Sequence, residues 1–308
     1  MQKIPIFGAL LHRYFSLRGQ SPSPLLPDSI QSCGTTAAFL HIAETIGLLP
    51  VLKQTFPQNW KQIFTYAHYL VCEGNVMQHC LLWNEQTKTI TDDISSPGSS
   101  EVFASLSFAS RMAFFRTWIA ANRGKRGALS AYAAYDVTSV STYARGIDRA
   151  EWGYNRDYEN LPQINVGMFF GEGVRLPVFY NWYSGSITDK ADLPFMMRYA
   201  GELGIGKVRF VLDQGFVTGG NCKYMHSKEL PFVTCLPHGR LDARNIRAAV
   251  SGRLKQSSHW IAEYQVYGLS IPYTLYGIAM TAHVIAGPDK EAADIKKLYA
   301  WIEKAEEE

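Results

Sequence analysis

The feature that most constrains this chain is a ten-residue run at positions 131–140, which is apolar, aromatic and β-branched and contains one carboxylate, Asp136. This composition predicts a β-strand that packs against a core. A carboxylate in a buried strand loses hydration, at a cost of several kcal/mol unless a cation or hydrogen-bond donors compensate. The run therefore predicts either a bound cation or partner beside Asp136, or an aspartate that caps a turn at the end of the strand.

A second run, residues 207–216, is also rich in apolar and β-branched residues and also contains an aspartate. It is a β-type segment that ends in Asp213, followed by Gly215 and by a helix-compatible segment at 221–230. If the two strands are neighbours in one sheet, the two carboxylates repel each other unless a cation lies between them. Paired carboxylates are typical ligands of hard divalent cations, so the pair predicts a site for Mg²⁺ or Mn²⁺.

Composition limits the class of protein. The chain has 308 residues, of which 47% are hydrophobic and 19% charged, which is enough for two folded domains. A formal net charge of +3 is too small to indicate a polyanionic partner by itself. The odd number of cysteines and the absence of a Cys-x-x-Cys pair predict free thiols rather than disulfides or a zinc site. These cysteines are Cys33, Cys72, Cys80, Cys222 and Cys235.

Neither export nor membrane insertion is expected. The first residues contain Pro5 within a short apolar run and lack a small-residue cleavage site, so the sequence predicts a cytoplasmic protein. Residues 264–288 carry no Asp, Glu, Lys or Arg, but glycine, proline and polar residues interrupt them. Two β-strands, rather than a membrane helix, are predicted there.

The front of the chain is predicted to be a small helical domain, residues 1–126, that binds DNA. A basic N-terminal segment ends in a proline- and serine-containing hinge at 21–24. Apolar residues then recur at helical spacing over 27–83. A polar break at 91–100, which includes Pro97 and Gly98, separates these helices from another predicted at 101–121. A short basic loop follows, which either contacts phosphates or is a solvated linker. Its cations are Arg123, Lys125 and Arg126.

The middle of the chain, residues 127–237, predicts an α/β domain with a mixed sheet. After the Asp136 strand come two strands at 164–170 and 176–182, joined by a glycine turn. A helix at 193–203, the Asp213 strand, a further helix and a strand at 231–236 complete the order. Three antiparallel strands followed by alternating helices and strands give the ribonuclease H-like layout, in which the first and fourth strands are neighbours. Asp136 and Asp213 would then meet at one site with the geometry for two-metal phosphoryl transfer.

Five sequence blocks in this region resemble, in order, those of DDE transposases of bacterial insertion sequences, in the branch with Tyr-Asp-Val-Thr-Ser at the first Asp. The resemblance covers about residues 30–308 and is loose in the front third. The blocks are Tyr135-Asp136-Val137-Thr138-Ser139, Trp152-Gly153-Tyr154-Asn155-Arg156-Asp157, Leu161-Pro162-Gln163-Ile164-Asn165, Gly185-Ser186-Ile187-Thr188-Asp189 and Leu212-Asp213-Gln214-Gly215-Phe216.

The resemblance implies metal-dependent DNA strand cleavage and strand transfer. Asp136 and Asp213 would be the first two metal ligands, the partners would be the element's inverted-repeat ends and target DNA, and the full-length protein would be a dimer. The family's third acid is a Glu on a later helix, between an Arg and a Lys at fixed spacings. Neither Glu291 nor Glu303 has an Arg in the matching place, and Gln214 stands where an Arg is common.

The missing Glu predicts that residues 238–308 begin a β-containing insertion and that the chain stops inside it, inactive when alone. Three acids at 306–308 end the last predicted helix against its macrodipole, as expected of a helix that was meant to continue. The insertion opens with a basic stretch that contacts a DNA backbone or is a solvated loop. Its candidate DNA-binding residues are Arg240, Arg244 and Arg247, accompanied by His238, Arg253 and Lys255, with Asp242 opposing them.

Other classes of function fit less well. No Ser-His-Asp or Cys-His pairing and no phosphate-binding loop stands out, which disfavours nucleophilic hydrolases and nucleotide-driven enzymes. Two alternatives to a transposase remain. One is a DNA-binding remnant without catalysis, and the other is a two-carboxylate nuclease that recruits another acid such as Glu172 or Asp189.

Overall fold

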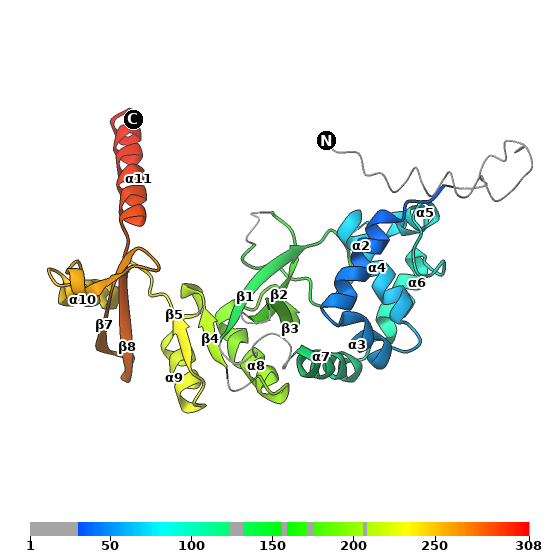
Figure 1. The fold of residues 1–308 in the computed structure, drawn as a ribbon, viewed down its shortest axis with the longest axis horizontal. Coiled ribbons are helices and arrows are strands. Elements are labelled where there is room, and N and C mark those ends of the chain that lie inside the picture. Colours follow the sequence, from blue (N-terminus) through cyan, green and yellow to red (C-terminus); the bar gives the residue numbers. More distant parts are fainter. Residues whose placement is uncertain are drawn as a thin grey trace, which may run out of the picture. The chain divides into compact units, whose positions relative to one another are not determined.

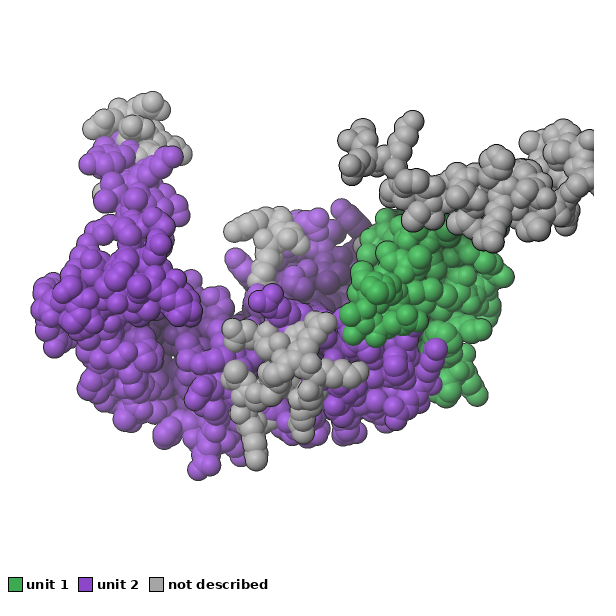
Figure 2. Space-filling model, in the orientation of Figure 1, with its two compact units in different colours: residues 1–45, 56–106 green, residues 46–55, 107–308 purple. Residues whose placement is uncertain are grey.

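The computed structural model describes residues 30–74, 76–122, 132–155, 159–171, 175–205 and 208–307. The chain divides into two compact units, coloured separately in Figure 2. One comprises Met1–Thr45 and Phe56–Leu106, and the other Ile46–Thr55 and Ser107–Glu308. The division falls before the domain boundary predicted at residue 126.

The first unit is helical. Its core consists of aromatic and apolar side chains from α4, α5 and the segment before α6, among them Tyr66, Tyr69 and Trp83. His68 is buried there as well, stacked at 5.0 Å on the ring of Phe39. Its helices are α2 (Gly34–Thr45), α4 (Trp60–Cys72), η1 (Met77–His79), α5 (Cys80–Gln86) and α6 (Ser96–Ser105).

The predicted polar break at 91–100 and single helix at 101–121 are wrong, because two helices, α6 and α7 (Phe108–Asn122), cover this stretch. Pro97 lies in the first turn of α6, where a missing N–H is tolerated, and the Gly98 N–H donates to the Ser95 side chain at 3.0 Å. The real break comes at residues 106–107, and Ser107 caps α7 by accepting from the Ser110 N–H at 3.1 Å.

The second unit contains a five-stranded sheet of order β3-β2-β1-β4-β5 (Figure 1). Strand β1 pairs antiparallel with β2 and parallel with β4; β2 pairs antiparallel with β3, and β4 parallel with β5. This order confirms the predicted ribonuclease H-like mixed sheet. The elements are α3 (Leu48–Thr55), β1 (Tyr132–Ser141), β2 (Gln163–Gly171), β3 (Leu176–Ser184), α8 (Asp189–Glu202), β4 (Arg209–Leu212), η2 (Gln214–Phe216), α9 (Gly219–Ser227) and β5 (Phe232–Thr234).

One face of this sheet forms the core, against α7, α8 and α9. Alternate residues of β1 point into it, including Tyr135, and meet Phe169 and Phe210 of the adjoining strands. Asp136 belongs to the other, exposed face of β1. The expectation that this carboxylate is desolvated inside a buried strand is therefore wrong, because the strand is buried on one side only.

A smaller three-stranded sheet, β6-β7-β8, follows the main sheet in sequence. Residues 264–288, which carry no Asp, Glu, Lys or Arg, contain the predicted β-hairpin. Tyr276 and Gly277 make its two-residue turn, with φ of 54° and 82°. Among the described residues no single helix is long and apolar enough to cross a membrane, although α2 and α3 taken together meet the length and composition criteria. The remaining elements are α10 (Leu241–Val250), η3 (Ser257–His259), β6 (Trp260–Ile261), β7 (Val266–Leu275), β8 (Ile278–Ala286) and α11 (Pro288–Glu307).

Candidate active site

A cavity of about 340 Å³ opens where β4 stops beside the longer β1. The last paired residues of these two parallel strands are Tyr135 and Leu212, so Asp136 and Asp213 come next at matching positions. Both line the cavity, and both are exposed to solvent. The strand register thus places both residues at the edge of one cavity, and their joint binding of a cation stays a prediction. The complete lining is Asp136, Ser139, Tyr154, Asn165, Gly185, Ser186, Ile187, Thr188, Asp189, Lys190, Asp213, Gly215 and Phe216.

Local contacts fix the two aspartates in place. The chain turns into η2 directly after Asp213, whose carbonyl accepts from the Phe216 N–H at 3.1 Å. The buried Phe216 ring then packs on the Tyr135 ring at a centroid distance of 5.1 Å. The Val137 N–H donates to Asp136 Oδ1 at 2.8 Å. Both aspartates are thus next to residues that are buried in the core, Tyr135 for Asp136 and Leu212 for Asp213. These neighbours hold the two carboxylates at the cavity.

A third acid, Asp189, lines the same cavity from the first turn of α8. The Tyr183 hydroxyl donates to Asp189 Oδ1 at 2.7 Å. Burial and this hydrogen bond raise the pKa of Tyr183 well above its ordinary range. Across the described parts of the chain, no three His, Cys, Asp or Glu side chains lie close enough together to hold one metal ion. Asp189 is therefore near Asp136 and Asp213 without completing a three-acid cluster, and Glu172 lies outside the described residues.

The donor set fits a hard divalent cation. Two carboxylates provide oxygen ligands, and the open cavity leaves the remaining coordination positions to water or phosphate oxygens. One ammonium group, Lys190, also lines the cavity and is suited to attract an anionic substrate.

A buried amide network supports one wall of the cavity. The fully buried Gln163 donates from Nε2 to the Tyr154 carbonyl at 2.8 Å and to Asn165 Oδ1 at 3.1 Å. Asn165 Nδ2 in turn donates to the Ile187 carbonyl at 3.1 Å. These bonds tie β2 to the loop before it and to the segment that leads into α8. The sequence marks both residues only as members of a block, because nothing local shows which remote carbonyls their amides reach.

Two glycines allow the same segments to approach closely. A Cβ on Gly153 would lie 1.8 Å from the Gly185 carbonyl oxygen, and a Cβ on Gly185 would lie 2.2 Å from the Gln163 carbonyl oxygen. Glu151 bridges to Gln163 through paired backbone hydrogen bonds of 3.1 and 3.0 Å. Glycine at both positions is therefore a steric requirement of this wall.

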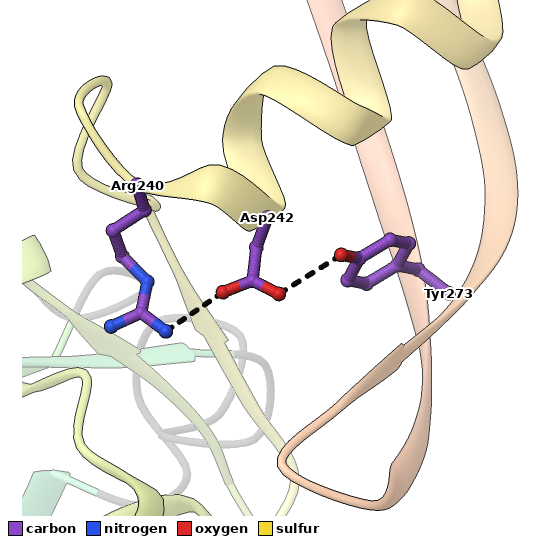
Figure 3. Close-up of polar contacts among 3 residues, drawn as sticks. All are labelled: Arg240, Asp242 and Tyr273. Carbon is purple, nitrogen blue, oxygen red and sulfur yellow. Dashed lines mark hydrogen bonds and ion pairs between the residues drawn. The ribbon is translucent and has the colours of Figure 1, made fainter.

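The predicted DNA-binding arginines of the insertion have different surroundings. Arg240 Nη2 forms an ion pair with Asp242 Oδ2 at 2.8 Å, and the Tyr273 hydroxyl donates to Asp242 Oδ1 at 2.9 Å (Figure 3). These two hydrogen bonds, that from Arg240 first, lower the pKa of Asp242. The triad fastens the start of α10 to β7, so part of the Arg240 guanidinium is occupied within the protein.

The remaining predicted cations are less constrained or are not described. Arg247 donates to the His238 carbonyl at 3.2 Å, and Arg244 is exposed on α10. The basic loop that contains Arg123, Lys125 and Arg126 lies outside the described residues.

Comparison with known proteins gives a weak structural likeness. No protein-family model and no curated protein sequence matches the chain. A piggyBac transposase synaptic complex with hairpin DNA is similar at 14% identity and a TM-score of 0.32, over 82% of this chain and 56% of that one. A Mos1 transposase paired-end complex with left transposon end has 8% identity and a TM-score of 0.25, over 84% and 77%. A pre-cleavage Mos1 transpososome has 8% identity and a TM-score of 0.27, over 84% of this chain and 78% of that one. Similarity this low carries no argument about chemistry, so the fold assignment rests on strand order.

Proposed function

We propose that this chain is a transposase of a bacterial insertion sequence that cleaves and joins DNA by DDE chemistry. The observation that carries the proposal is the pair Asp136 and Asp213, placed at matching positions where β1 and β4 part and lining one cavity. The sequence blocks that resemble the family's contribute the walls of the same cavity. DNA ends and target DNA are the proposed partners, with a dimer as the active form.

In this proposal each part of the cavity has a role. Asp136 and Asp213 would hold Mg²⁺ or Mn²⁺. When bound, such ions activate the attacking oxygen and stabilise the leaving oxygen of a phosphodiester. Lys190 attracts the phosphodiester into the cavity, and the Gln163 and Asn165 amides keep the wall rigid so that the strand is held in one position. The DNA contacts proposed for Arg123, Lys125, Arg126, Arg240, Arg244 and Arg247 position the backbone outside the cavity.

The third acid decides between two forms of the proposal. A clamp on both the attacking and the leaving oxygen needs more ligands than two carboxylates, so we expect little or no cleavage by residues 1–308 alone. Asp189, which lines the same cavity, favours a second candidate function, a nuclease in which Asp189 supplies the third carboxylate. If no cation binds, the chain is instead a DNA-binding remnant of a transposase without catalysis.

Mn²⁺ binding measured by calorimetry tests the site itself. We expect binding to the purified chain that Asp136→Asn and Asp213→Asn each abolish, and that the exposed Asp148→Asn leaves unchanged. Equal Mn²⁺ binding by all four proteins would refute the metal site, and the chain would then be a DNA-binding remnant without catalysis.

Strand cleavage of duplex DNA carrying the element ends, with Mg²⁺ or Mn²⁺, then separates the two enzymes. Metal-dependent cleavage by the chain alone that disappears in both Asp136→Ala and Asp189→Ala would favour the nuclease. No cleavage, in a chain that binds Mn²⁺ through Asp136, is the result expected of the transposase whose third acid is not among these residues.

A further inference from the structure

Two arginines from distant parts of the chain contact one tryptophan at the edge of the main sheet. The Arg111 guanidinium carbon lies 3.9 Å from the centre of the Trp182 ring. On the backbone of the same residue, Arg149 Nη1 donates to the Trp182 carbonyl at 2.9 Å. Arg111 comes from the first turns of α7, Arg149 from the loop after β1, and Trp182 from β3, which is the edge strand. The fold therefore brings together two cations that are not neighbours in sequence.

Among the described residues, no acid forms an ion pair with either Arg111 or Arg149. Arg111 Nε is buried and has no hydrogen-bond partner in the described structure. Burial lowers the pKa of Arg111, and the nearby charge of Arg149 lowers it further, against an opposing effect of the Tyr180 phenol. Two guanidinium groups held close together repel each other, and an anion between them removes that repulsion.

The surroundings suit a phosphate group. Arg111 is the fourth residue of the 15-residue helix α7, whose N-terminal end carries partial positive charge. A guanidinium presents a planar fork of N–H donors that matches phosphate oxygens, and stacking on an aromatic ring holds that fork in a fixed plane. Tyr180, 41% exposed on the same strand as Trp182, adds a hydroxyl donor and an aromatic surface.

We propose that Arg111 and Arg149, which both contact Trp182, bind a backbone phosphate of the DNA strand that enters the cavity. The inference rests on the proposed function, because it takes DNA to be the substrate of that cavity. It adds a site that none of the sequence blocks marks.

The site lies close to the cavity along the chain. The Gly185 N–H donates to the Arg149 carbonyl at 3.3 Å, and Gly185 lines the cavity. Trp182 precedes Gly185 by three residues, which is about 10 Å of extended strand. A phosphate held there would belong to a nucleotide beside the cavity rather than to the scissile bond itself. Such a contact fixes the direction and register of the strand without reading its sequence.

The salt dependence of DNA binding tests the proposal. Anisotropy of a fluorescein-labelled duplex is measured without divalent cations over a range of KCl concentrations, for the wild type and for Arg149→Gln, Arg111→Gln and the double variant. Removing one cation that binds a phosphate should reduce the slope of log K against log salt by about 1. The matched control is Arg198→Gln, which removes an exposed arginine that also lies over an aromatic ring, 5.5 Å from that of Phe195, on α8.

We expect a shallower slope and weaker binding for Arg149→Gln and for the double variant, and no change for Arg198→Gln. Slopes equal to that of the wild type, or an equal reduction in Arg198→Gln, would overturn the proposal. If circular dichroism shows that Arg111→Gln does not fold, the exposed Arg149→Gln decides alone. Failure of the proposed function would instead appear as loss of the Asp136-dependent Mn²⁺ binding, which this metal-free measurement does not depend on.

Discussion

Asp192 allows the clearest test of the energetics of the second unit. Its side chain is 7% exposed in the first turn of α8, and Oδ2 has no hydrogen-bond partner in the described structure. Burial, helped by the negative charge of Asp189, raises the pKa of Asp192 from 3.8 to about 6. The folded state therefore binds this proton more tightly than the unfolded state does. Its contribution to the free energy of unfolding is greatest below the unfolded pKa and is lost as pH rises through about 6.

The substitution Asp192→Asn removes the charge and keeps the size of the side chain. A shift of about two pKa units corresponds to about 3 kcal/mol. At pH 8 the variant should therefore be more stable than the wild type by about 2 to 3 kcal/mol, and at pH 4 the two should differ little.

Urea unfolding followed by tryptophan fluorescence at a series of pH values measures this difference. Only the difference between the two proteins is interpreted, because other carboxylates titrate over the same range. The same change at the exposed Asp148 should stay within about 0.5 kcal/mol of the wild type throughout. An Asp192→Asn protein that is less stable than the wild type at pH 8 would refute the reasoning, because it would mean that the carboxylate has a favourable ionic partner.

Two further perturbations follow from the packing. Gly185→Ala should destabilise the protein by about 3 kcal/mol or more, because the new Cβ would lie 2.2 Å from the Gln163 carbonyl oxygen. Gly201→Ala, where the Cβ would enter open space on α8, should instead raise stability by about 0.5 to 1 kcal/mol. Equal urea midpoints for the two variants would contradict this reasoning. His68 is buried with Nε2 unpartnered in the described structure, and burial lowers its pKa from 6.5, so the first unit should lose stability as pH falls below 6.5. His68→Phe should abolish that loss in thermal unfolding at pH 5, and an unchanged pH dependence would exclude His68 as its source.

Much of the main sheet can be predicted from the sequence because its signals are local. Alternating or apolar runs bounded by glycine turns indicate β2 and β3, and a β-run ending in Asp213 indicates β4. The ribonuclease H-like order follows from the sequence of element types, and it implies that Asp136 and Asp213 meet. Register cannot be predicted in this way, yet it is the register of β1 and β4 that puts the two acids at equivalent positions.

The errors and omissions come from information that a single run does not contain. Apolar residues occur on both faces of β1, with Ala134 and Val140 on the exposed face, so composition alone cannot show that Asp136 faces solvent. Pro97 resembles a helix breaker in the sequence, although in the first turn of a helix it is compatible with helical structure. The partners of Gln163 and Arg111 lie on other segments, and only the folded chain reveals them.

The parallel pairing of β1 with β4 has a consequence for biosynthesis. Tyr132 pairs with Arg209 only after a helix and two strands have been placed between them. A contact between such distant residues forms late, because closing a long loop costs entropy before the contact is made. The helices of the first unit can form as soon as they leave the ribosome, whereas Asp136 and Asp213 remain far apart until the chain beyond Phe216 has emerged. The proposed transposase would therefore have no paired carboxylates with which to cut DNA until the chain has emerged as far as Phe216.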